Sequence, residues 1–280
     1  MVELIGKLFR LLPDFRGKRN LARWLLGKKI KKHKDLEVSG RFGCSYLVPN
    51  LEEIIGFELF VNGVFELDII SFLIGRLPQN GVLLDLGANI GAIALPICKE
   101  RPDATVICVE ASPFVTKYLK SNLNSNRIVN ARIIEGVLSD KAGEKIDFYF
   151  PDRQFGKGAV TNLFHAESLP IDSVTIDELI EKEKIDKVNL IKMDIEGYEY
   201  FALKGGSRLL EGDEAPPILF EFVDYAENSV PGLKAGSAQS LLRQYGYELF
   251  HLMNGKLFPM DSPITGGFAM IWAVKPRIKK

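Results

Sequence analysis

The stretch "LLDLGANIG", Leu83 to Gly91, joins an apolar run that ends in an acid to a turn that contains two glycines. The run "VLLDL" predicts a buried β-strand, and the glycines let the backbone of the turn approach a ligand closely. The helix expected after the turn offers free N–H groups at its N-terminus. Gly87 and Gly91 are spaced G-x-x-x-G, whereas a dinucleotide-binding turn shows G-x-G-x-x-G. The stretch therefore predicts a ligand turn of another kind.

The composition is that of an ordinary globular protein. The chain has 280 residues, of which 46% are hydrophobic and 26% charged, as expected for a globular protein with one main domain. No run approaches the roughly 20 apolar residues that span a bilayer, and the N-terminus lacks the features of a signal peptide. We therefore expect a cytoplasmic protein. Cys44, Cys98 and Cys108 lack metal-ligand spacing and are expected to be free thiols.

Residues 1–34 differ in charge from the rest of the chain. They hold 11 Lys and Arg against two acidic residues, a net charge of +9, and the remaining residues carry −9. Their apolar residues recur at helical spacing and predict two short amphipathic helices. Contact with an anionic membrane surface would suit such helices, and so would packing on the protein's own domain. Nucleic acid is a third alternative, but the segment has no recognisable nucleic-acid motif and none is expected to bind.

From residue 35 onward the pattern becomes regular. Residues 36–66 predict short strands with turns at "VPN" and "VNG", and Glu66–Leu77 predicts a helix that ends at Pro78. Strands and helices then alternate. We expect strands at Val82–Leu86, Thr105–Glu110, Ala131–Leu138, Val188–Asp194 and Ile218–Phe222, and helices at Ala92–Glu100, Pro113–Asn122, Tyr198–Leu210 and Ala238–Tyr245.

This alternation predicts an α/β protein with a doubly wound, Rossmann-like sheet and a ligand at the carboxyl ends of the strands. Two late strands, Glu248–Met253 and Phe268–Val274, are expected to form a closing antiparallel hairpin. The predicted domains are a basic helical extension, residues 1–34, and a main domain, residues 35–280.

Two acids at consecutive strand ends indicate the ligand. Asp85 stands where the pyrophosphate of a dinucleotide would approach, and a carboxylate repels phosphate but attracts a cation. S-adenosylmethionine has no phosphate and carries a sulfonium and an ammonium group, so Asp85 suits it better. Glu110, in "VICVEASP", ends the next strand, where an acid accepts hydrogen bonds from ribose hydroxyls.

A third signal is "VNLIKMDIEGYEYFALKGG", residues 188–206. Lys192, Asp194 and Glu196 are two residues apart and share one face if strand geometry persists. Charges at the end of an apolar strand are costly unless they are paired or used, and a purely structural salt bridge is the alternative explanation. Glu221, in "ILFEF" on the expected next strand, is predicted to pair with Lys192.

At this point the sequence resembles the FkbM-type methyltransferases. The resemblance is carried by "LLDLGANIG", "VEASP", "DSVTIDEL", "IKMDIEGYEYFALKGG" and "ILFEF", in order and over about residues 60–250. One departure is "EASP", where the family more often shows Glu-Pro-x-Pro, so that Ala111 leaves the loop after Glu110 less rigid. The resemblance does not extend to the basic N-terminus.

The resemblance implies an S-adenosylmethionine-dependent methyltransferase with the seven-stranded fold, usually one that methylates a hydroxyl of a sugar, a glycolipid or a secondary metabolite. Because a hydroxyl is a poor nucleophile, a positioned base would assist the transfer. No metal is required by these residues. The candidate catalytic residues are Lys192, Asp194, Glu196, Glu221 and His165; the candidate cofactor-binding residues are Asp85, Gly87, Ala88, Asn89, Gly91, Glu110, Ala111 and Asp194.

Two other functions stay open at this stage. A nicotinamide-dependent oxidoreductase uses a similar sheet, although it would be expected to show the dinucleotide glycines. A binding protein could keep the cofactor fold without catalysis. His165 lies in an inserted loop, and we expect residues 150–165, with Arg153 and Lys157, to form a substrate loop.

Overall fold

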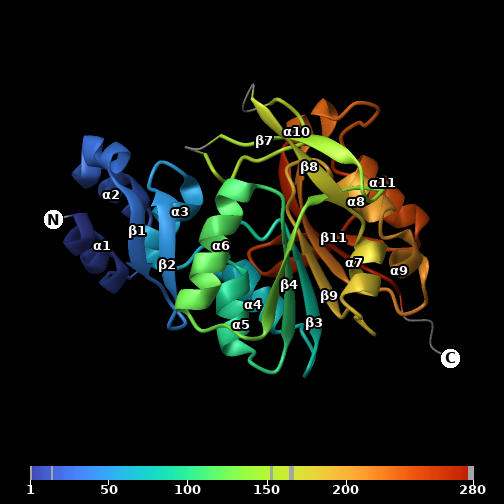
Figure 1. Ribbon diagram of the computed structural model, residues 1–280, viewed down its shortest axis with the longest axis horizontal. Helices are drawn as coiled ribbons and strands as arrows, with labels where there is room; N and C mark the ends of the chain where they lie inside the picture. The colour runs from blue at the N-terminus through green and yellow to red at the C-terminus, as the bar shows by residue number, and fades with distance from the viewer. Residues whose placement is uncertain (1, 14, 152–153, 164–166, 277–280) are drawn as a thin grey trace.

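The structure is a computed structural model that describes residues 2–13, 15–151, 154–163 and 167–276. Its largest feature is an eight-stranded sheet in the order β12-β11-β13-β10-β9-β3-β4-β5 (Figure 1). The strands from β10 to β5 run parallel, while β13 and β12 are antiparallel to their neighbours. The strands are β3 (Val82–Leu86), β4 (Thr105–Glu110), β5 (Ala131–Glu135), β9 (Leu190–Met193), β10 (Ile218–Val223), β11 (Glu248–Met253), β12 (Lys256–Pro259) and β13 (Phe268–Val274).

Helices cover both faces of this sheet, because alternate residues of its buried strands point to opposite faces. Leu83 of β3 belongs to a core cluster with side chains of α4, α5 and α6, whereas Leu84 belongs to a second cluster with α7, α8, α9 and α11. The predicted doubly wound α/β architecture is confirmed. The helices from α4 onward are α4 (Leu67–Ile74), α5 (Ala94–Glu100), α6 (Pro113–Ser125), α7 (Ile176–Lys182), α8 (Glu199–Lys204), α9 (Ser207–Glu211), α10 (Asp224–Ser229) and α11 (Ser237–Gln244).

The strand order reverses at β3. From β3 the chain moves to β4 and β5 on one side, and it later places β9 and β10 on the other side. Asp85 of β3 therefore lies beside both Cys108 of β4 and Lys192 of β9. Doubly wound sheets bind ligands at such a switch point, outside the carboxyl ends of the strands. The predicted ligand turn, residues 87–91, begins at this point.

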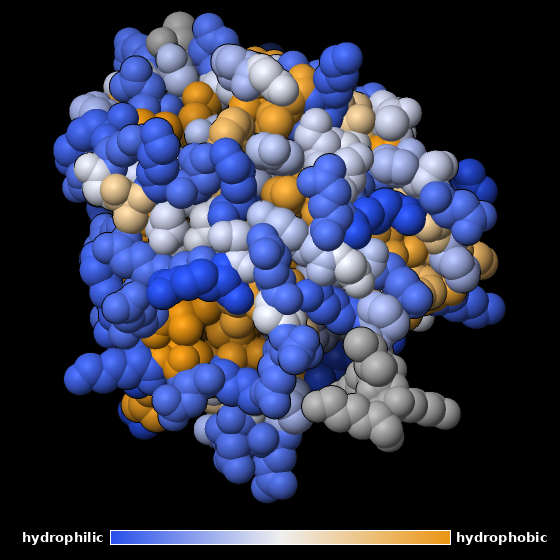
Figure 2. Space-filling view, turned by 90° about the vertical axis from the view of Figure 1, so that its right-hand side faces the viewer, coloured by the Kyte–Doolittle hydropathy of each residue, from blue (hydrophilic) through white to orange (hydrophobic). Residues whose placement is uncertain are grey.

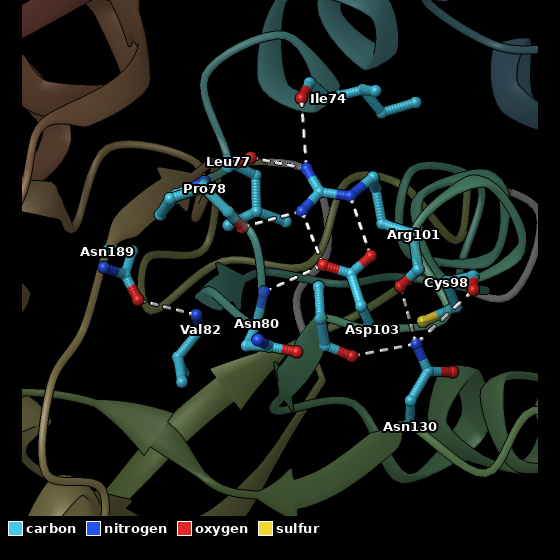
Figure 3. A network of polar contacts seen from close by, with 11 residues as sticks. Ile74, Leu77, Pro78, Asn80, Val82, Cys98, Arg101, Asp103, Asn130 and Asn189 are labelled. Carbon is cyan, nitrogen blue, oxygen red and sulfur yellow. Dashed lines mark hydrogen bonds and ion pairs between the residues drawn. The ribbon is translucent and has the colours of Figure 1, made fainter.

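Figure 3 shows how the loop that enters β3, at the opposite end of the strand, is held. The Arg101 guanidinium donates to the carbonyl oxygen of Pro78 at 2.7 Å and pairs with the Asp103 carboxylate at 2.8 Å. Asp103 also accepts from the backbone N–H of Asn80 at 2.8 Å. The hydrogen bonds from Arg101 and Asn80 hold the pKa of Asp103 well below its usual range. The network fixes the start of β3, and thereby the position of the turn at its other end.

The N-terminal elements lie at one end of the molecule, beyond a small antiparallel sheet of β1 and β2 (Figure 1). The two predicted helices are present as α1 and α2. Their buried side chains, including Phe9 and Leu26, join the same core cluster as Phe60 of α3. The division into domains 1–34 and 35–280 stays a prediction. The elements are α1 (Val2–Leu11), α2 (Lys18–Leu26), the 3₁₀ helix η1 (Gly27–Lys32), β1 (Lys34–Ser39), β2 (Ser45–Asn50) and α3 (Ile54–Asn62).

The prediction of strands throughout residues 36–66 is wrong for α3. Its sequence, "IIGFELFVN", is rich in the β-branched and aromatic residues that favour strands. The helix is, however, buried on most of its surface, and tertiary packing overrides such local preferences. Glu53 caps its first turn by accepting from the backbone N–H of Ile54, and Gly63, with a φ of 70°, ends it.

A third sheet, in the order β6-β8-β7, lies above the carboxyl end of the main sheet in Figure 1. The single strand predicted for Ala131–Leu138 is interrupted at Gly136, whose φ is 159°. A Cβ atom there would lie 3.0 Å from the carbonyl oxygen of Asp172, so the two chains approach closely at this glycine. The strands are β6 (Val137–Leu138), β7 (Lys145–Tyr149) and β8 (Ser168–Val174).

Two further predictions need correction. The late strands β11 and β13 do pair antiparallel, but β12 lies between them in sequence and adds an eighth strand to the seven expected. The predicted helix Tyr198–Leu210 is two helices, α8 and α9. The break falls at Gly205 and Gly206, and only glycine fits at 205, because a Cβ atom there would lie 2.0 Å from the carbonyl oxygen of Ser139.

None of the helices in the described residues has the length and apolar character needed to cross a bilayer.

Candidate active site

A cavity of about 860 Å³, its mouth included, lies where β3, β4 and β9 end. Residues that directly follow or end these strands, including Gly87, Glu110 and Asp194, line it. The cavity therefore occupies the place predicted for the ligand.

The turn after β3 forms one wall of the cavity. Gly87 has a φ of 81°, and a Cβ atom there would lie 1.9 Å from the carbonyl oxygen of Asp194, so no other residue fits. The backbone N–H groups of Gly87 and Ala88 both donate to the carbonyl oxygen of Val109, at 2.9 and 3.0 Å. These bonds tie the turn to the end of β4. Gly91, with a φ of 85°, closes the turn in a tight contact with Leu95.

Glu110 ends β4 and is 8% exposed. Its carboxylate accepts hydrogen bonds from the backbone N–H groups of Asn89 at 2.9 Å and Ser112 at 2.8 Å. Burial raises its pKa to about 7, although these two bonds act in the opposite direction. A carboxylate with two oxygens has about four acceptor positions, so it can accept further bonds from a ligand. Ala111, which follows it, also lines the cavity.

Lys192 and Asp85 form a buried ion pair beneath the cavity. The Lys192 Nζ atom lies 3.3 Å from Oδ1 of Asp85 and 4.0 Å from Oδ2 of Asp194. It donates to the carbonyl oxygen of Gly87 at 3.0 Å. Lys192 lines the cavity, whereas Asp85 is fully buried and does not. Asp85 therefore holds the turn and Lys192 in place. Because its carboxylate does not reach the cavity, this geometry does not favour direct contact between Asp85 and a cationic ligand.

The prediction that Lys192 pairs with Glu221 is wrong. Strand register explains the difference, because Lys192 lies beside Asp85 of β3 on one side and beside Leu219 of β10 on the other. Glu221 is two residues further along β10, and its side-chain hydrogen bond is with Asp194. The pairing could not be predicted without knowing which strands are neighbours and in which register.

Three predicted catalytic acids do come together. One carboxylate oxygen each from Asp194, Glu196 and Glu221 lie within 4.8 Å of one another. Burial and the nearby charge of Asp194 raise the pKa of Glu221 to about 10 and that of Glu196 to about 7. Glu221 therefore carries a proton at neutral pH. The Asp194 side chain is 35% exposed and thus accessible from the cavity.

The loop after β9 brings these acids together by leaving strand geometry. Glu196 and Gly197 have φ values of 53° and 95°, so the predicted common strand face ends at Met193. Buried Glu199 accepts from the backbone N–H of Ile195 at 3.1 Å and holds the loop in this shape.

The predicted substrate loop reaches the cavity. Phe155 and Gly156 line it, and the Asn89 side chain donates to the carbonyl oxygen of Phe155 at 3.4 Å. Lys157 pairs with Glu196 at 3.3 Å. The candidate base His165 lies outside the described residues.

Glu66 is a site residue that the sequence analysis missed. It begins α4, lines the cavity and has a φ of 50°, a strained conformation for a residue other than glycine. Burial, followed by the charge of Asp194, raises its pKa to about 7. The signal available in the sequence was the pair of acids Glu66 and Asp68 in the largely apolar stretch "VFELDII", and Glu66 was attributed to a helix start.

Comparison with known proteins identifies the family. The methyltransferase FkbM domain matches residues 85–249, which is more than half of the chain. The chain belongs to the FkbM methyltransferase family. It is therefore a methyltransferase whose cofactor is S-adenosyl-L-methionine, as the resemblance implied.

Two relatives of the chain are named as methyltransferases of a hexuronic acid and of a 2-O position. The chain is 31% identical over 176 residues to hexuronic acid methyltransferase AglP of Haloferax volcanii, covering 62% of this chain and 69% of the relative. It is 25% identical over 146 residues to 2-O-methyltransferase NoeI of Sinorhizobium fredii, covering 46% and 58%. Among solved structures, it is similar to a precorrin-6y C5,15-methyltransferase of Geobacter metallireducens, with 12% identity, a TM-score of 0.45 and coverage of 75% and 87%.

The residues around the cavity fit this cofactor. The turn at Gly87 leaves backbone close to the cavity, as an extended ligand requires. The buried Glu110 carboxylate offers acceptors for hydroxyl groups, and the acidic side chains of Glu66 and Asp194 on the cavity wall suit a ligand with cationic groups.

The three clustered carboxylates could also hold a metal ion, since their oxygens lie within 4.8 Å of one another. One feature opposes it: Lys157 already pairs with Glu196 at 3.3 Å. The expectation that no metal is required stays a prediction.

Proposed function

We propose that the protein transfers the methyl group of S-adenosyl-L-methionine to a hydroxyl oxygen of a sugar. The observation that carries this proposal is the convergence of Asp194, Glu196 and Glu221 beside the cofactor cavity. A hydroxyl acceptor needs a base, and methyl transfer from sulfur to oxygen otherwise depends on alignment and exclusion of water. This cluster supplies one partly exposed carboxylate, Asp194, and two acids with raised pKa values, Glu196 and Glu221.

We assign cofactor binding to the turn after β3 and to the end of β4. Gly87, Ala88, Asn89 and Gly91 shape the wall that the cofactor lies against, and Glu110 accepts hydrogen bonds from the ribose hydroxyls. Ala111 lies beside the adenine position. Glu66 and Asp194 face the cationic groups of the cofactor, a role that the sequence analysis gave to Asp85. Support for this assignment comes from the cavity lining and from the burial of Asp85 beneath it.

The bound cofactor supplies an electrophilic methyl carbon. Asp194 then accepts the proton of the attacking hydroxyl, and protonated Glu221 donates a hydrogen bond to Asp194 and keeps it oriented. The Lys192 Nζ atom, 4.0 Å from the Asp194 carboxylate, stabilises the negative charge of Asp194 before the proton arrives. The Lys157–Glu196 pair holds the substrate loop against the cavity and helps to exclude water.

A sugar is the acceptor class that the relatives favour, since one is named for hexuronic acid and another for 2-O-methylation. A glycan or another hydroxylated small molecule would present the same chemical group.

The test is incubation of the full chain with S-adenosyl-L-methionine carrying a labelled methyl group and a panel of hexuronic acids, neutral sugars and glycolipids. Transfer of label to a hydroxyl, located by mass spectrometry and NMR, would support the proposal. Transfer only to nitrogen, sulfur or carbon acceptors would overturn it. Cofactor binding by calorimetry without transfer to any acceptor would favour a non-catalytic cofactor-binding protein.

A further inference from the structure

The surface of the N-terminal helices is unusually apolar. Of the 16 large apolar side chains that are exposed in the described residues, eight lie between residues 4 and 25. Trp24 is 77% exposed and Leu11 is 83% exposed. Exposed apolar side chains that gather on one side of a helix, in contrast to single scattered ones, indicate an interaction site. The eight residues, here called the apolar face, are Leu4, Leu8, Leu11, Leu12, Phe15, Leu21, Trp24 and Leu25.

The apolar face is not the side by which the helices pack on the protein. On α1, Val2 and Phe9 are buried, and a Cβ atom at Gly6 would lie 2.6 Å from the Phe60 ring of α3. Leu4, Leu8 and Leu11 follow the i, i+4, i+7 pattern and share another face of the helix. On α2, Ala22 and Leu26 are buried, whereas Leu21, Trp24 and Leu25 share an exposed side.

Polar contacts anchor the two helices in this orientation. Arg10 of α1 donates to the carbonyl oxygen of Phe60 at 2.7 Å, and Arg19 of α2 pairs with Glu58 at 2.8 Å. The Arg23 guanidinium lies 4.9 Å from the centre of the Phe57 ring. The apolar face is therefore presented by helices that are fixed to α3, and it is not the product of a loosely attached segment.

Basic side chains accompany the apolar face. Residues 1–34 carry a net charge of +9, and Lys7, Arg16, Lys28 and Lys31 are exposed. Apolar and aromatic side chains beside Lys and Arg are the composition of a helix that lies in the interface of a bilayer. Figure 2, by contrast, shows the side of the molecule opposite α1 and α2, where hydrophilic side chains cover most of the surface and apolar areas lie between them.

We propose that the apolar face of α1 and α2 docks on an anionic lipid bilayer. The apolar side chains enter the interface, and the surrounding Lys and Arg contact the anionic headgroups. A nucleic acid would gain little from the leucines, and self-association through this face would bring two charges of +9 together. This inference is independent of the methyl acceptor proposed above.

Docking would also bring the cavity near the membrane. Helix α3 contacts both α1 and α2, and its residue Ile55 lines the cavity. At about 1.5 Å per residue, this nine-residue helix is about 14 Å long.

The test is co-sedimentation of the full chain with vesicles of phosphatidylcholine, alone or mixed with phosphatidylglycerol. We expect binding to the mixed vesicles near 0.1 M salt and much weaker binding near 1 M salt, where the screening length falls from about 10 to about 3 Å. Trp24 gives a second readout, because its fluorescence should shift to shorter wavelength on docking, whereas Trp272 is 6% exposed and already in the core. Absence of binding to the mixed vesicles at low salt overturns the proposal.

Four variants separate the contributions. Leu11→Glu with Trp24→Glu should abolish binding, and Lys28→Gln with Lys31→Gln should weaken it about 25-fold, since each basic residue near an anionic surface contributes about fivefold. The matched controls are Val129→Glu, at a site 93% exposed, and Lys256→Gln, exposed on β12; both should bind as the wild type does.

Cofactor affinity and thermal stability should be unchanged in all four variants, which shows that the protein remains folded. Wild-type binding by the Leu11→Glu, Trp24→Glu variant would overturn the proposal. A dimer in solution that this variant converts to a monomer, without vesicle binding by either, would assign the face to self-association instead and would equally overturn it.

Discussion

The Nζ atom of Lys192 lies 3.3 Å from Oδ1 of Asp85, and the two side chains are 7% and 0% exposed. Burial opposes both charges, and each charge offsets the cost for the other. The pair joins the acid of "LLDL", Asp85, to the lysine of "IKMD" on the adjacent parallel strand. The pair lies beneath the turn at Gly87, which forms a wall of the cofactor cavity.

Replacement of Lys192 should therefore destabilise the fold. In Lys192→Met the Asp85 carboxylate is buried without its partner, and the free energy of unfolding should fall by about 3–5 kcal/mol. The measurement is urea denaturation at neutral pH. Lys187→Met is the matched control, because its pair with Glu214 is exposed and should contribute at most about 1 kcal/mol. If both variants lose the same small amount, the buried pair does not have the role assigned to it.

Glu110→Ala should weaken cofactor binding. The loss of hydrogen bonds between a charged acceptor and the ribose hydroxyls is expected to cost about 1–3 kcal/mol, measured by calorimetry with S-adenosyl-L-methionine. Glu135→Ala is a suitable control, because Glu135 ends the neighbouring strand β5 and pairs at the surface with Lys120. An unchanged affinity in Glu110→Ala would count against the ribose assignment.

Asp194→Asn tests the proposed base. The amide keeps the shape of the side chain but cannot accept the proton, so turnover should fall about 10²–10⁴-fold while cofactor affinity changes much less. Asp213→Asn, at an exposed position before β10, should leave turnover unchanged. Near-normal turnover in Asp194→Asn would remove the catalytic role and direct attention to Glu196 or His165.

Glu66 should make stability depend on pH. Its pKa of about 7 in the folded protein is above its usual value of 4.5, so the folded state binds more protons between these values. The contribution of Glu66 to the free energy of unfolding is therefore fully present below about pH 4.5 and is lost as the pH rises through 7. The unfolding free energy of Glu66→Gln, relative to wild type, should therefore rise by about 1–3 kcal/mol between pH 4.5 and 8.

The measurement is urea denaturation of both proteins across that pH range, without cofactor. A difference that is constant with pH would mean that Glu66 has an ordinary pKa. With S-adenosyl-L-methionine present, the effect should shrink, because a cationic ligand favours the charged carboxylate.

The sequence by itself determined the alternation of strands and helices, the location of the ligand turn and the acids at the strand ends. These features depend on local properties: an apolar run such as "VLLDL" can only be buried, and Gly87 with Gly91 permits a turn that other residues cannot adopt. The motifs also sufficed to identify the family, because they recur in order along the chain.

Only the tertiary structure decided which charges meet and which local preferences are overruled. Lys192 pairs with Asp85 and not with Glu221 because strand order and register are set by long-range pairing. "IIGFELFVN" forms a helix because its surroundings bury it on most sides. Glu66 becomes a site residue because α4 starts at the cavity, far along the chain from Asp194. Each of these outcomes is a property of contacts between distant residues, which periodicity and composition do not encode.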